Sequence, residues 1–372
     1  MSLQPLRVGI AGATGYVGAE LLRMLRRHPA VKVVAVASSG SGGTALRARL
    51  PAHTPGGDVP SQFCTLEVDN FSACDAVFCA LPHGVGAGFI AQLVRAGRTV
   101  FDLSADFRLK DPAVYAQWYG THPAPELLAQ AHYALPEWFT TPTRSEPAPE
   151  SAGGPSGGPT APQLFALPGC YPTASVLALA PLFKQGWIAP GPLVVQGFSG
   201  TSGAGRQAKD SLHFCAVAEG FRAYGPAGTH RHTPEIEATL AALSGREVTL
   251  SFQPHLLPMT RGLAVTATAP ASEAFQALPD PASALAAAYE AAYAAHPLVR
   301  VLERGVLPDT LWVRGSAGAV VAAHFDARTG QLFAYAALDN LLKGAAAQAL
   351  QVMNLHFGWP EVLGLDVEAA WP

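Results

Sequence analysis

Residues 6–25, LRVGIAGATGYVGAELLRML, predict how the fold begins. The apolar run Leu6–Ala11 is typical of a short buried strand, and Gly15–His28 has apolar residues at helical spacing until Pro29 ends the pattern. Between them, residues 12–18 form a GxxGxxG turn. A turn of this kind between a first strand and a first helix is typical of dinucleotide binding, because glycines let a pyrophosphate approach the backbone and the helix N-terminus.

The alternation of strand and helix continues to residue 103. The further strand-like runs are Val31–Ala37, Ala76–Leu81 and Thr99–Leu103, and a helical pattern covers Gly86–Ala96. Alternating elements of this kind predict a parallel, doubly wound sheet. We therefore expect an α/β fold with a Rossmann-type domain at the start of the chain.

The second half of the chain has a different pattern. Five strand-like runs follow one another there, at residues 192–200, 247–256, 262–269, 319–327 and 332–338. They predict a second, mostly antiparallel sheet, which an alanine-rich helix at 282–295 would cover. A last helix at Asn340–His356 is long enough to pack back on the first domain.

Between the two halves, residues 140–163 read TTPTRSEPAPESAGGPSGGPTAPQ. This segment has six Pro, four Gly and no large apolar residue, so it cannot form a core. We expect a flexible surface loop without a catalytic role. A polyproline ligand for a partner domain is the alternative.

Composition excludes several classes of protein. The 372 residues carry a formal charge of −3, and only 14% are charged, which disfavours nucleic-acid binding. No apolar run reaches the roughly 18 residues of a membrane span, and the N-terminal residues lack the pattern of a secretory signal. The five cysteines include no CxxC pair, which disfavours a disulfide framework or structural zinc site. We expect a cytoplasmic protein without nucleic-acid or membrane partners.

The end of the second strand bears on which cofactor binds. Enzymes that use NAD usually place a carboxylate there for the ribose 2′-hydroxyl. Here residues 36–40 read VASSG, without a carboxylate that would repel a 2′-phosphate. Ser38 and Ser39 could accept that phosphate, which favours NADP, although both could also be ordinary turn residues.

Cys170 lies in residues 167–173, LPGCYPT, where Pro172 suits the first turn of a helix. A cysteine at the positive end of a helix dipole favours the thiolate, and the nearby N–H groups suit an oxyanion. We therefore interpret Cys170 as a nucleophile. For Cys64, Cys74, Cys79 and Cys215 we expect small buried hydrophobic residues.

Candidates for a base occur about 60 residues downstream, in residues 224–235, YGPAGTHRHTPE. A neutral imidazole near a thiolate can hold and return protons at neutral pH, so His230 and His232 are candidates. Either one could instead be structural. The HxH spacing could also be half of a metal site, but no third ligand follows at a suitable spacing, and we expect no metal.

An NADP turn combined with a cysteine at a helix start suggests one chemistry. The thiolate attacks an activated acyl group, and hydride from the nicotinamide reduces the resulting thioester to an aldehyde. Two other classes stay open: an NADP-binding redox sensor that uses Cys170, and a cysteine hydrolase. The sensor would lack a nearby resolving cysteine, and the hydrolase leaves the dinucleotide turn unexplained.

A series of motifs, in order from about residue 7 to residue 358, resembles one family. These motifs are GATGYVGAELLRML, ALPHGV, DLSADFRL, YALPE, LPGCYPTA, SGTSGAGR, GTHRHTPEI, PHLLPMTRG and DNLLKGAAAQALQVMN. Together they resemble the N-acetyl-γ-glutamyl-phosphate reductases, NADPH-dependent enzymes of arginine biosynthesis. A related family of lysine biosynthesis, which acts on a carrier-bound or N-acylated aminoadipyl phosphate, shares SADFRL and HRH, and it is the alternative.

The resemblance implies a domain organisation. Residues 1–169 would be the NADP-binding Rossmann domain, with the 140–163 insert. Residues 170–338 would be an inserted α+β domain for catalysis, substrate binding and oligomerisation. Residues 339–372 would carry the helix that returns to the Rossmann domain. The family also implies a homodimer or homotetramer, with a small acyl phosphate as substrate and inorganic phosphate as product.

The resemblance also implies site residues. Cys170 would be the nucleophile and His230 the acid/base, so the rate should vary with pH. Candidates for substrate binding are Arg108, Ser199, Ser202, Arg206, Tyr224, His232, Glu235 and Arg261. Candidates for NADP binding are Gly12, Thr14, Gly15, Tyr16, Val17, Ser38, Ser39, Leu81, Pro82, Gly203 and Asn340. Arg108 and Arg261 would bind substrate anions through their forked donors, although either could instead form a structural salt bridge.

Overall fold

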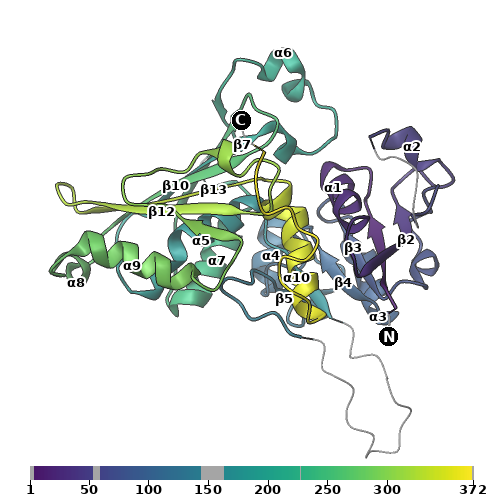
Figure 1. The fold of residues 1–372 in the computed structure, drawn as a ribbon, viewed down its shortest axis with the longest axis horizontal. Helices are drawn as coiled ribbons and strands as arrows, with labels where there is room; N and C mark the ends of the chain where they lie inside the picture. The colour runs from purple at the N-terminus through teal and green to yellow at the C-terminus, as the bar shows by residue number, and fades with distance from the viewer. Residues whose placement is uncertain (1–3, 53–58, 144–162, 227, 371–372) are drawn as a thin grey trace, which may run out of the picture. The chain divides into compact units, whose positions relative to one another are not determined.

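Two structural units make up the chain in the computed structural model, which describes residues 4–52, 59–143, 163–226 and 228–370. Unit 1 comprises Met1–Pro168 with Ala346–Leu365, and unit 2 comprises Gly169–Ala345 with Asp366–Pro372. Each is described by itself below (Figure 1). Residues 144–162 of the proline- and glycine-rich segment lie outside the described residues, so the predicted flexible loop stays a prediction.

Unit 1 contains a six-stranded sheet in the order β2-β1-β3-β4-β6-β5, and every pairing is parallel. Its strands are β1 (Leu6–Ala11), β2 (Val31–Ala37), β3 (Ala76–Cys79), β4 (Thr99–Asp102), β5 (His132–Tyr133) and β6 (Leu164–Ala166). The chain moves outward from β1 to β2 and then crosses to β3 on the other side of β1. That reversal is the topological switch point of a doubly wound sheet, where ligands bind, and the predicted Rossmann-type fold is confirmed.

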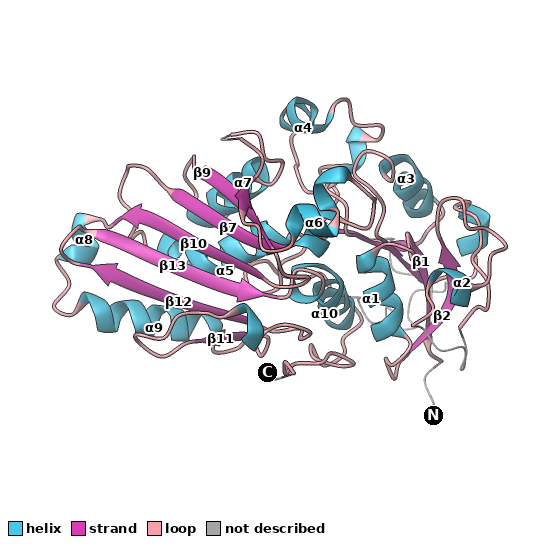
Figure 2. Cartoon of the chain, turned by 90° about the horizontal axis from the view of Figure 1, so that it is seen from above, coloured by secondary structure: helices cyan, strands magenta, loops and turns pink. Residues whose placement is uncertain are grey.

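Helices cover both faces of this sheet, with α3 and α4 on one face and α1 and α10 on the other (Figure 2). The helices of unit 1 are α1 (Tyr16–Leu25), α2 (Leu46–Arg49), α3 (Ala87–Arg95), α4 (Pro112–Tyr119) and α10 (Ala347–His356). Within the sheet, the rings of Phe78, Phe101 and Phe165 stack from β3 to β6 at 4.8 and 5.1 Å, and all three are fully buried. Burial of such large rings contributes much of the core's hydrophobic stabilisation.

The last helix is shorter than the sequence predicts. Instead of one helix over 340–356, a π-helical turn covers Leu342–Ala346 and α10 follows. The chain passes from unit 2 to unit 1 at this turn. Inside unit 1, α10 holds the tail through Asn354, whose amide donates to the carbonyls of Glu361 and Leu363 at 3.0 and 2.9 Å.

Unit 2 contains a seven-stranded mixed sheet in the order β11-β12-β13-β10-β7-β9-β8. Its strands are β7 (Val194–Gly200), β8 (Arg222–Ala223), β9 (Ser251–Leu257), β10 (Leu263–Pro270), β11 (Val299–Val301), β12 (Ala319–Asp326) and β13 (Gln331–Leu338). Figure 2 shows the longer strands side by side. The β7–β9 and β11–β12 pairs are parallel, and the other pairs are antiparallel, so the predicted mostly antiparallel sheet is confirmed. The parallel β7–β9 pair requires a crossover connection, which contains α7 (Thr233–Ser244).

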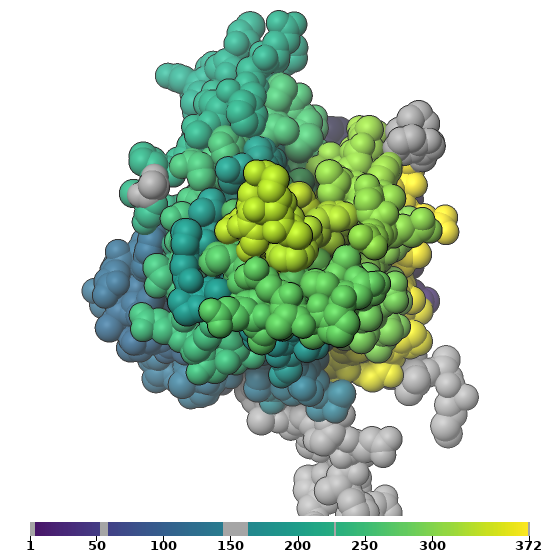
Figure 3. All heavy atoms as spheres, turned by 90° about the vertical axis from the view of Figure 1, so that its left-hand side faces the viewer, coloured from purple at the N-terminus to yellow at the C-terminus, as the bar shows by residue number. Residues whose placement is uncertain are grey.

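Helices α5 (Cys170–Lys184), α7 and α9 (Pro281–Tyr293) lie against one face of this sheet (Figure 2). The turn between β12 and β13, lime in Figure 3, projects toward the viewer. The segment that carries α6 (Phe214–Val217), teal in the same view, also stands out from the unit. Among the described residues, no helix combines the length and the apolar character needed to cross a membrane.

Helix α5 is buried on every side from Tyr171 to Phe183, although it contains Pro181. A proline has no N–H, so the carbonyl four residues earlier loses its helical donor. That carbonyl belongs to Leu177, and the Tyr293 hydroxyl of α9 donates to it at 2.5 Å. The Tyr289 hydroxyl donates to the next carbonyl, Ala178. Two tyrosines thus satisfy the backbone groups at this point of the buried helix.

We expect Tyr293→Phe to lower the free energy of unfolding by about 1–3 kcal/mol, because the buried Leu177 carbonyl loses its donor while the packing is kept. Urea unfolding measures the change. Tyr335→Phe is the matched control, because Tyr335 is half-buried and its hydroxyl makes no hydrogen bond within the described residues. Equal unfolding midpoints for the Tyr293 variant and the wild type would contradict this account.

Candidate active site

The three glycines of the turn in unit 1 differ in how closely other atoms approach them. Gly12 has a φ of +91°, and a Cβ there would lie 2.2 Å from the Ala80 carbonyl oxygen. A Cβ on Gly18 would lie 2.3 Å from the Gly12 carbonyl oxygen, so only glycine allows the helix to pack this closely. At Gly15 the nearest atom would be 3.5 Å away. The turn therefore leaves its open side at Gly15, at the N-terminus of α1, where backbone N–H groups can bind a phosphate.

The predicted NADP residues beside this turn follow β1, β2 and β3. The Ser38 side chain is buried, and its hydroxyl forms a 2.5 Å hydrogen bond with that of Thr14, while Ser39 is exposed. Tyr16 is 42% exposed at the start of α1, and Val17 is half-buried beside it. Leu81 and Pro82 follow β3. Of the two serines, Ser39 is therefore better placed to meet a 2′-phosphate, and the cofactor roles stay predictions.

Arg108 of the SADFRL motif is buried in unit 1. Its Nε donates to the Leu167 carbonyl at 2.7 Å, and its Nη2 donates to the Leu103 carbonyl at 3.0 Å. These carbonyls follow β6 and β4, so the guanidinium ties the ends of two strands together. The alternative for Arg108 was a structural salt bridge. These two hydrogen bonds are also structural, but their acceptors are backbone carbonyls and not a carboxylate. The predicted substrate role stays a prediction.

Two carboxylates of the longer motif DLSADFRL, Asp102 and Asp106, were not singled out from the sequence. Asp106 accepts hydrogen bonds from the Gly84 backbone N–H at 2.7 Å and from the Tyr115 hydroxyl at 3.2 Å, and it thereby braces the loop after β3. Asp102 is fully buried nearby. Burial, with the Asp106 charge second, raises the pKa of Asp102 to about 7. Asp102 ends β4 and Asp106 lies four residues later, and nothing in this local sequence indicates that both side chains are buried.

Cys170 is the first residue of α5, as the sequence predicts, with Gly169 as the N-cap residue. The thiol residue is partly exposed. Glu235, buried in the first turn of α7, accepts a hydrogen bond from the Gly169 N–H at 2.9 Å. Gly344 of the π-helical turn packs on the other side, where a Cβ would lie 2.8 Å from the Cys170 Cβ. The nucleophile candidate is therefore held from both sides.

His230 and His232 pack with two tyrosines of unit 2. The ring of His230 lies 5.0 Å from that of His232, 5.6 Å from Tyr224 and 5.9 Å from Tyr171. The Tyr224 hydroxyl donates to that of Tyr171 at 3.4 Å, which donates to the His255 carbonyl at 3.2 Å. The sequence patterns thus bring Tyr224, His230 and His232 together, whereas Tyr171 was missed although it directly follows Cys170.

The electrostatics of this cluster favour neutral rings. Burial, assisted by the Arg231 charge, lowers the pKa of His230 to about 4. Burial also raises the pKa of Tyr224 to about 12, and a negative charge on Cys170 adds to that shift. His230 is therefore neutral at pH 7. Tyr171, which directly follows Cys170, joins this end of α5 to the cluster through its hydrogen bond with Tyr224 and its ring contact with His230.

Asn340 connects several of the predicted residues. Its Oδ1 accepts a hydrogen bond from the Gly262 N–H at 3.0 Å, and its Nδ2 donates to the Ser202 hydroxyl at 2.9 Å. A Cβ on Gly203 would lie 2.8 Å from the hydroxyl of Ser199, which is also buried. The Asn340 amide thus links β10, β13 and the turn after β7, and its predicted contact with the nicotinamide stays a prediction.

Asp339, which the sequence analysis missed, organises the same region. Its Oδ1 accepts from the backbone N–H groups of Leu341 and Leu342 at 2.8 and 3.2 Å, so it caps the π-helical turn. Its Oδ2 accepts from the Gly315 N–H at 2.8 Å and faces Arg261 at 3.6 Å. Arg261, 27% exposed, is held by this ion pair. An aspartate directly before a helix was the available signal.

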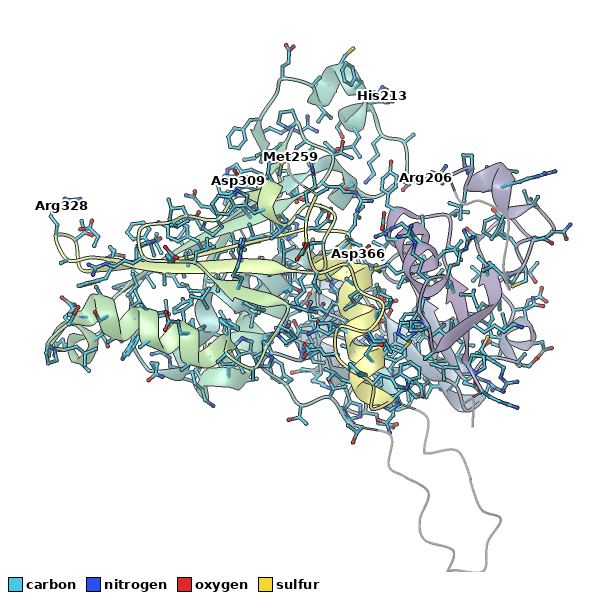
Figure 4. All side chains as sticks on the ribbon, viewed as in Figure 1. Arg206, His213, Met259, Asp309, Arg328 and Asp366 are labelled. Carbon is cyan, nitrogen blue, oxygen red and sulfur yellow. The ribbon has the colours of Figure 1, made fainter. Side chains whose placement is uncertain are left out.

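Arg206 follows the turn that carries Ser202 and Gly203. It is exposed, and Figure 4 places it with His213 on the projecting segment that carries α6. Cys215 on this segment is exposed as well, so the expectation that it is buried is wrong, because α6 is too short to bury more than one face. Cys74 and Cys79 are buried as expected, and Cys64 is half-buried.

Residues 4–52, 59–143, 163–226 and 228–370 contain no cluster of three His, Cys, Asp or Glu side chains that could hold a metal ion. Unit 1 thus carries a glycine turn suited to a dinucleotide phosphate. Unit 2 carries a cysteine at a helix start, and the next residue, Tyr171, packs against His230 and bonds to Tyr224.

Comparisons with known proteins agree with this arrangement. Residues 7–145 match the family model described as the NAD binding domain of semialdehyde dehydrogenase, and residues 170–340 match the model described as its dimerisation domain. An N-acetyl-gamma-glutamyl-phosphate reductase of Geobacter sp. strain M21 is 44% identical over 99% of this chain and 100% of the relative. One from Rhodospirillum rubrum is 43% identical over 99% of each chain.

Solved structures share the fold at low sequence identity. Aspartate semialdehyde dehydrogenase II from Vibrio cholerae superposes with a TM-score of 0.67 at 16% identity, over 95% of this chain and 98% of that one. Aspartate semialdehyde dehydrogenase with NADP from Candida albicans gives a TM-score of 0.64 at 17% identity, with the same coverage. These likenesses support the two-domain α/β fold.

We expect Gly344→Ala to destabilise the chain by about 1–3 kcal/mol, because the new methyl group would collide with Cys170 and force the start of α5 to move. Alkylation of Cys170 by iodoacetamide should slow as well. Peptide mass spectrometry and thermal unfolding measure the two effects. Gly88→Ala in α3 is the control, because open space surrounds that position. Unchanged alkylation and stability in the Gly344 variant would refute the close approach.

Proposed function

Because the chain belongs to the N-acetyl-γ-glutamyl-phosphate reductase family of semialdehyde dehydrogenases, we propose that it reduces N-acetyl-γ-glutamyl phosphate to N-acetylglutamate 5-semialdehyde in arginine biosynthesis. NADPH is the reductant and inorganic phosphate the second product. The observation that carries the proposal is Cys170 at the start of α5, where the next residue, Tyr171, packs against His230, in a chain whose first strand ends in a dinucleotide turn.

Unit 1 fits NADPH, which supplies a hydride when it is bound. The open side at Gly15 and the N-terminus of α1 suit the pyrophosphate, and no acidic residue lies in the first turn of α1. Exposed Ser39 at the end of β2 suits the 2′-phosphate, because no carboxylate there repels it.

Cys170 carries the covalent chemistry. Its thiolate attacks the acyl carbon, so a C–S bond forms while the C–O bond to phosphate breaks and inorganic phosphate leaves. Reduction of the thioester gives a thiohemiacetal alkoxide, which expels the thiolate and becomes the aldehyde. The N-terminal N–H groups of α5 stabilise negative charge at both stages, and Glu235 and Gly344 hold that terminus in place.

Substrate anions are best met by the arginines of unit 2. Arg261 keeps part of its surface exposed while Asp339 fixes its direction, and Arg206 is exposed on its loop. We assign the substrate carboxylate and phosphate to these two residues, without dividing the roles between them. Arg108 is the weaker candidate, because its Nε and Nη2 already donate to backbone carbonyls.

For assembly and location, we propose a homodimer or homotetramer that works in the cytoplasm. The matched family model for residues 170–340 is described as a dimerisation domain, which supports self-association. The proposed role in arginine biosynthesis is the ground for the location.

Cys170→Ser should lose turnover by at least about three orders of magnitude, because a serine hydroxyl is not ionised at neutral pH. Phosphate-dependent reduction of NADP⁺ with N-acetylglutamate semialdehyde measures the reverse reaction. A fluorescence titration should show that NADPH still binds. Cys215→Ser, a change at an exposed cysteine, should leave turnover unchanged. A fully active Cys170→Ser variant would contradict the proposed covalent role of Cys170.

N-Acetylglutamate semialdehyde should react with kcat/KM at least about ten-fold higher than its aminoadipyl homologue, since one methylene in a fitted pocket changes specificity by about 10–200-fold. Both aldehydes are assayed side by side with NADP⁺ and phosphate. A preference for the aminoadipyl compound would instead support the related function in lysine biosynthesis, which the names of the relatives do not favour.

A further inference from the structure

We propose that Asp106 is a positioning residue for NADPH: its buried carboxylate holds the turn at residues 82–85 beside the glycine turn, and it thereby sets the affinity for the cofactor. The use of NADPH in this statement rests on the proposed function. Asp106 is not among the cofactor or substrate residues that the family resemblance implies. All the contacts that carry the proposal lie within unit 1.

The turn at residues 82–85 lies next to the glycine turn, at the edge of the sheet where ligands bind. The strands β1 and β3 are neighbours, and the winding of the sheet reverses between β2 and β3. A ligand of a doubly wound sheet binds at this reversal, outside the carboxyl ends of the strands. A Cβ on Gly12 would lie 2.2 Å from the Ala80 carbonyl oxygen and 3.4 Å from the Leu81 side chain. The two loops are therefore in contact, and residues 82–85 border the expected cofactor site.

The turn has a backbone donor that its own hydrogen bond does not use. The Val85 N–H donates to the Pro82 carbonyl at 3.2 Å and closes the turn. Gly84, the third residue, has a φ of +75°, which glycine adopts most easily. Its N–H donates to Oδ1 of Asp106 at 2.7 Å. Residues 82–85 are all exposed, so hydrogen bonds hold this turn more than packing does.

A second hydrogen bond joins the same two segments in the opposite direction. The Ala105 N–H donates to Nδ1 of His83 at 2.9 Å. Residues 83 and 84 of the loop after β3 are thus tied to residues 105 and 106 of the loop after β4. Because only one of the two bonds uses a side chain of the β4 loop, a substitution at Asp106 removes that bond and leaves the other donor in place.

Asp106 is itself fixed by neighbours that do not belong to the turn. The Tyr115 hydroxyl of α4 donates to the same Oδ1 at 3.2 Å. His122 Nε2 donates to the Asp106 carbonyl at 2.9 Å, while its Nδ1 accepts from the Ala124 N–H at 3.0 Å. The side chains of Asp106 and Tyr115 are buried. The carboxylate therefore has a fixed position to which the exposed turn can bind.

The other carboxylate oxygen shows why an acid stands at this position. Oδ2 of Asp106 is buried and has no hydrogen-bond partner among the described residues. A buried carboxylate oxygen without a partner is costly, and an apolar side chain would fill the space without this cost. The hydrogen bonds at Oδ1, of which that from Gly84 is the shorter, account for the presence of the acid.

The affinity for NADPH tests the proposal directly. Asp106→Ala should raise the Kd for NADPH, measured by fluorescence titration, by about 10–100-fold, the usual effect of losing a hydrogen bond to a charged group. The KM for NADP⁺ should rise with it. At saturating NADP⁺, kcat and the KM for the aldehyde should stay within about three-fold of wild type, because the turn acts on the cofactor alone.

Two further variants distinguish positioning from a general loss of stability. Asp106→Asn keeps an oxygen that can accept from Gly84, so its Kd should stay within about three-fold of wild type. Asp75→Ala is the matched control, because Asp75 accepts the Arg7 N–H at 2.9 Å directly before β3, at the opposite end of that strand. Its Kd should not change. An equal rise in Kd for folded Asp106→Ala and Asp75→Ala would overturn the proposal.

Hydrogen–deuterium exchange of a peptide that contains residues 81–86 reports the turn without any assay of activity. Exchange should be faster in Asp106→Ala than in wild type, because the Gly84 N–H loses its acceptor. Unchanged exchange together with unchanged Kd would refute the role of Asp106. If Asp106→Ala does not fold, Tyr115→Phe takes its place, since it keeps the ring and frees the carboxylate from one donor. It should raise the Kd about two- to five-fold, and an unchanged Kd would overturn the proposal.

These experiments separate this proposal from the proposed function. A wild-type chain that binds NADPH but turns over neither aldehyde would refute the function, while the Kd values still test Asp106. An active wild type whose Kd for NADPH is unchanged in Asp106→Ala would refute the role of Asp106 alone.

Discussion

The start of α5 is the constraint on which the rest of unit 2 depends. A buried carboxylate, Glu235, binds the Gly169 N–H, and Gly344 approaches so closely that any side chain would collide with Cys170. Both contacts come from segments far away in the sequence. They fix the direction of α5, which is buried on all sides. Pro181 has no N–H to donate within this helix, and two tyrosine hydroxyls donate to the backbone carbonyls there.

Charged side chains in each unit hold the backbone in place. Asp339 caps the π-helical turn and directs Arg261, and Arg108 joins the ends of two strands. In a chain with 14% charged residues, each buried charge must be satisfied by hydrogen bonds or by a partner, because an unpaired one is costly.

A substantial part of the fold could be predicted because the spacing of apolar residues and glycines within single segments indicates it. The glycine turn and the apolar runs identified the parallel sheet and the bounds of α1, α3 and α9 to within three residues, whereas α4 and α7 were not predicted. The helix over 340–356 was wrong at its beginning, since the chain there forms a π-helical turn whose shape follows from Asp339 and Cys170. Burial of Cys215 was wrong for a similar reason: exposure of a short helix depends on what packs against it.

The sequence by itself determined the dinucleotide turn, the cysteine at a helix start and the histidine pair, because spacing within one segment expresses each of them. Only the tertiary structure decided that the His232 N–H faces Nδ1 of His230, that Glu235 holds Gly169, and that Asn340 bridges Ser202 and Gly262. Hydrogen bonds of this kind depend on distances of about 3 Å between atoms. The last two join segments that no local pattern relates, and the first depends on how a single ring is turned.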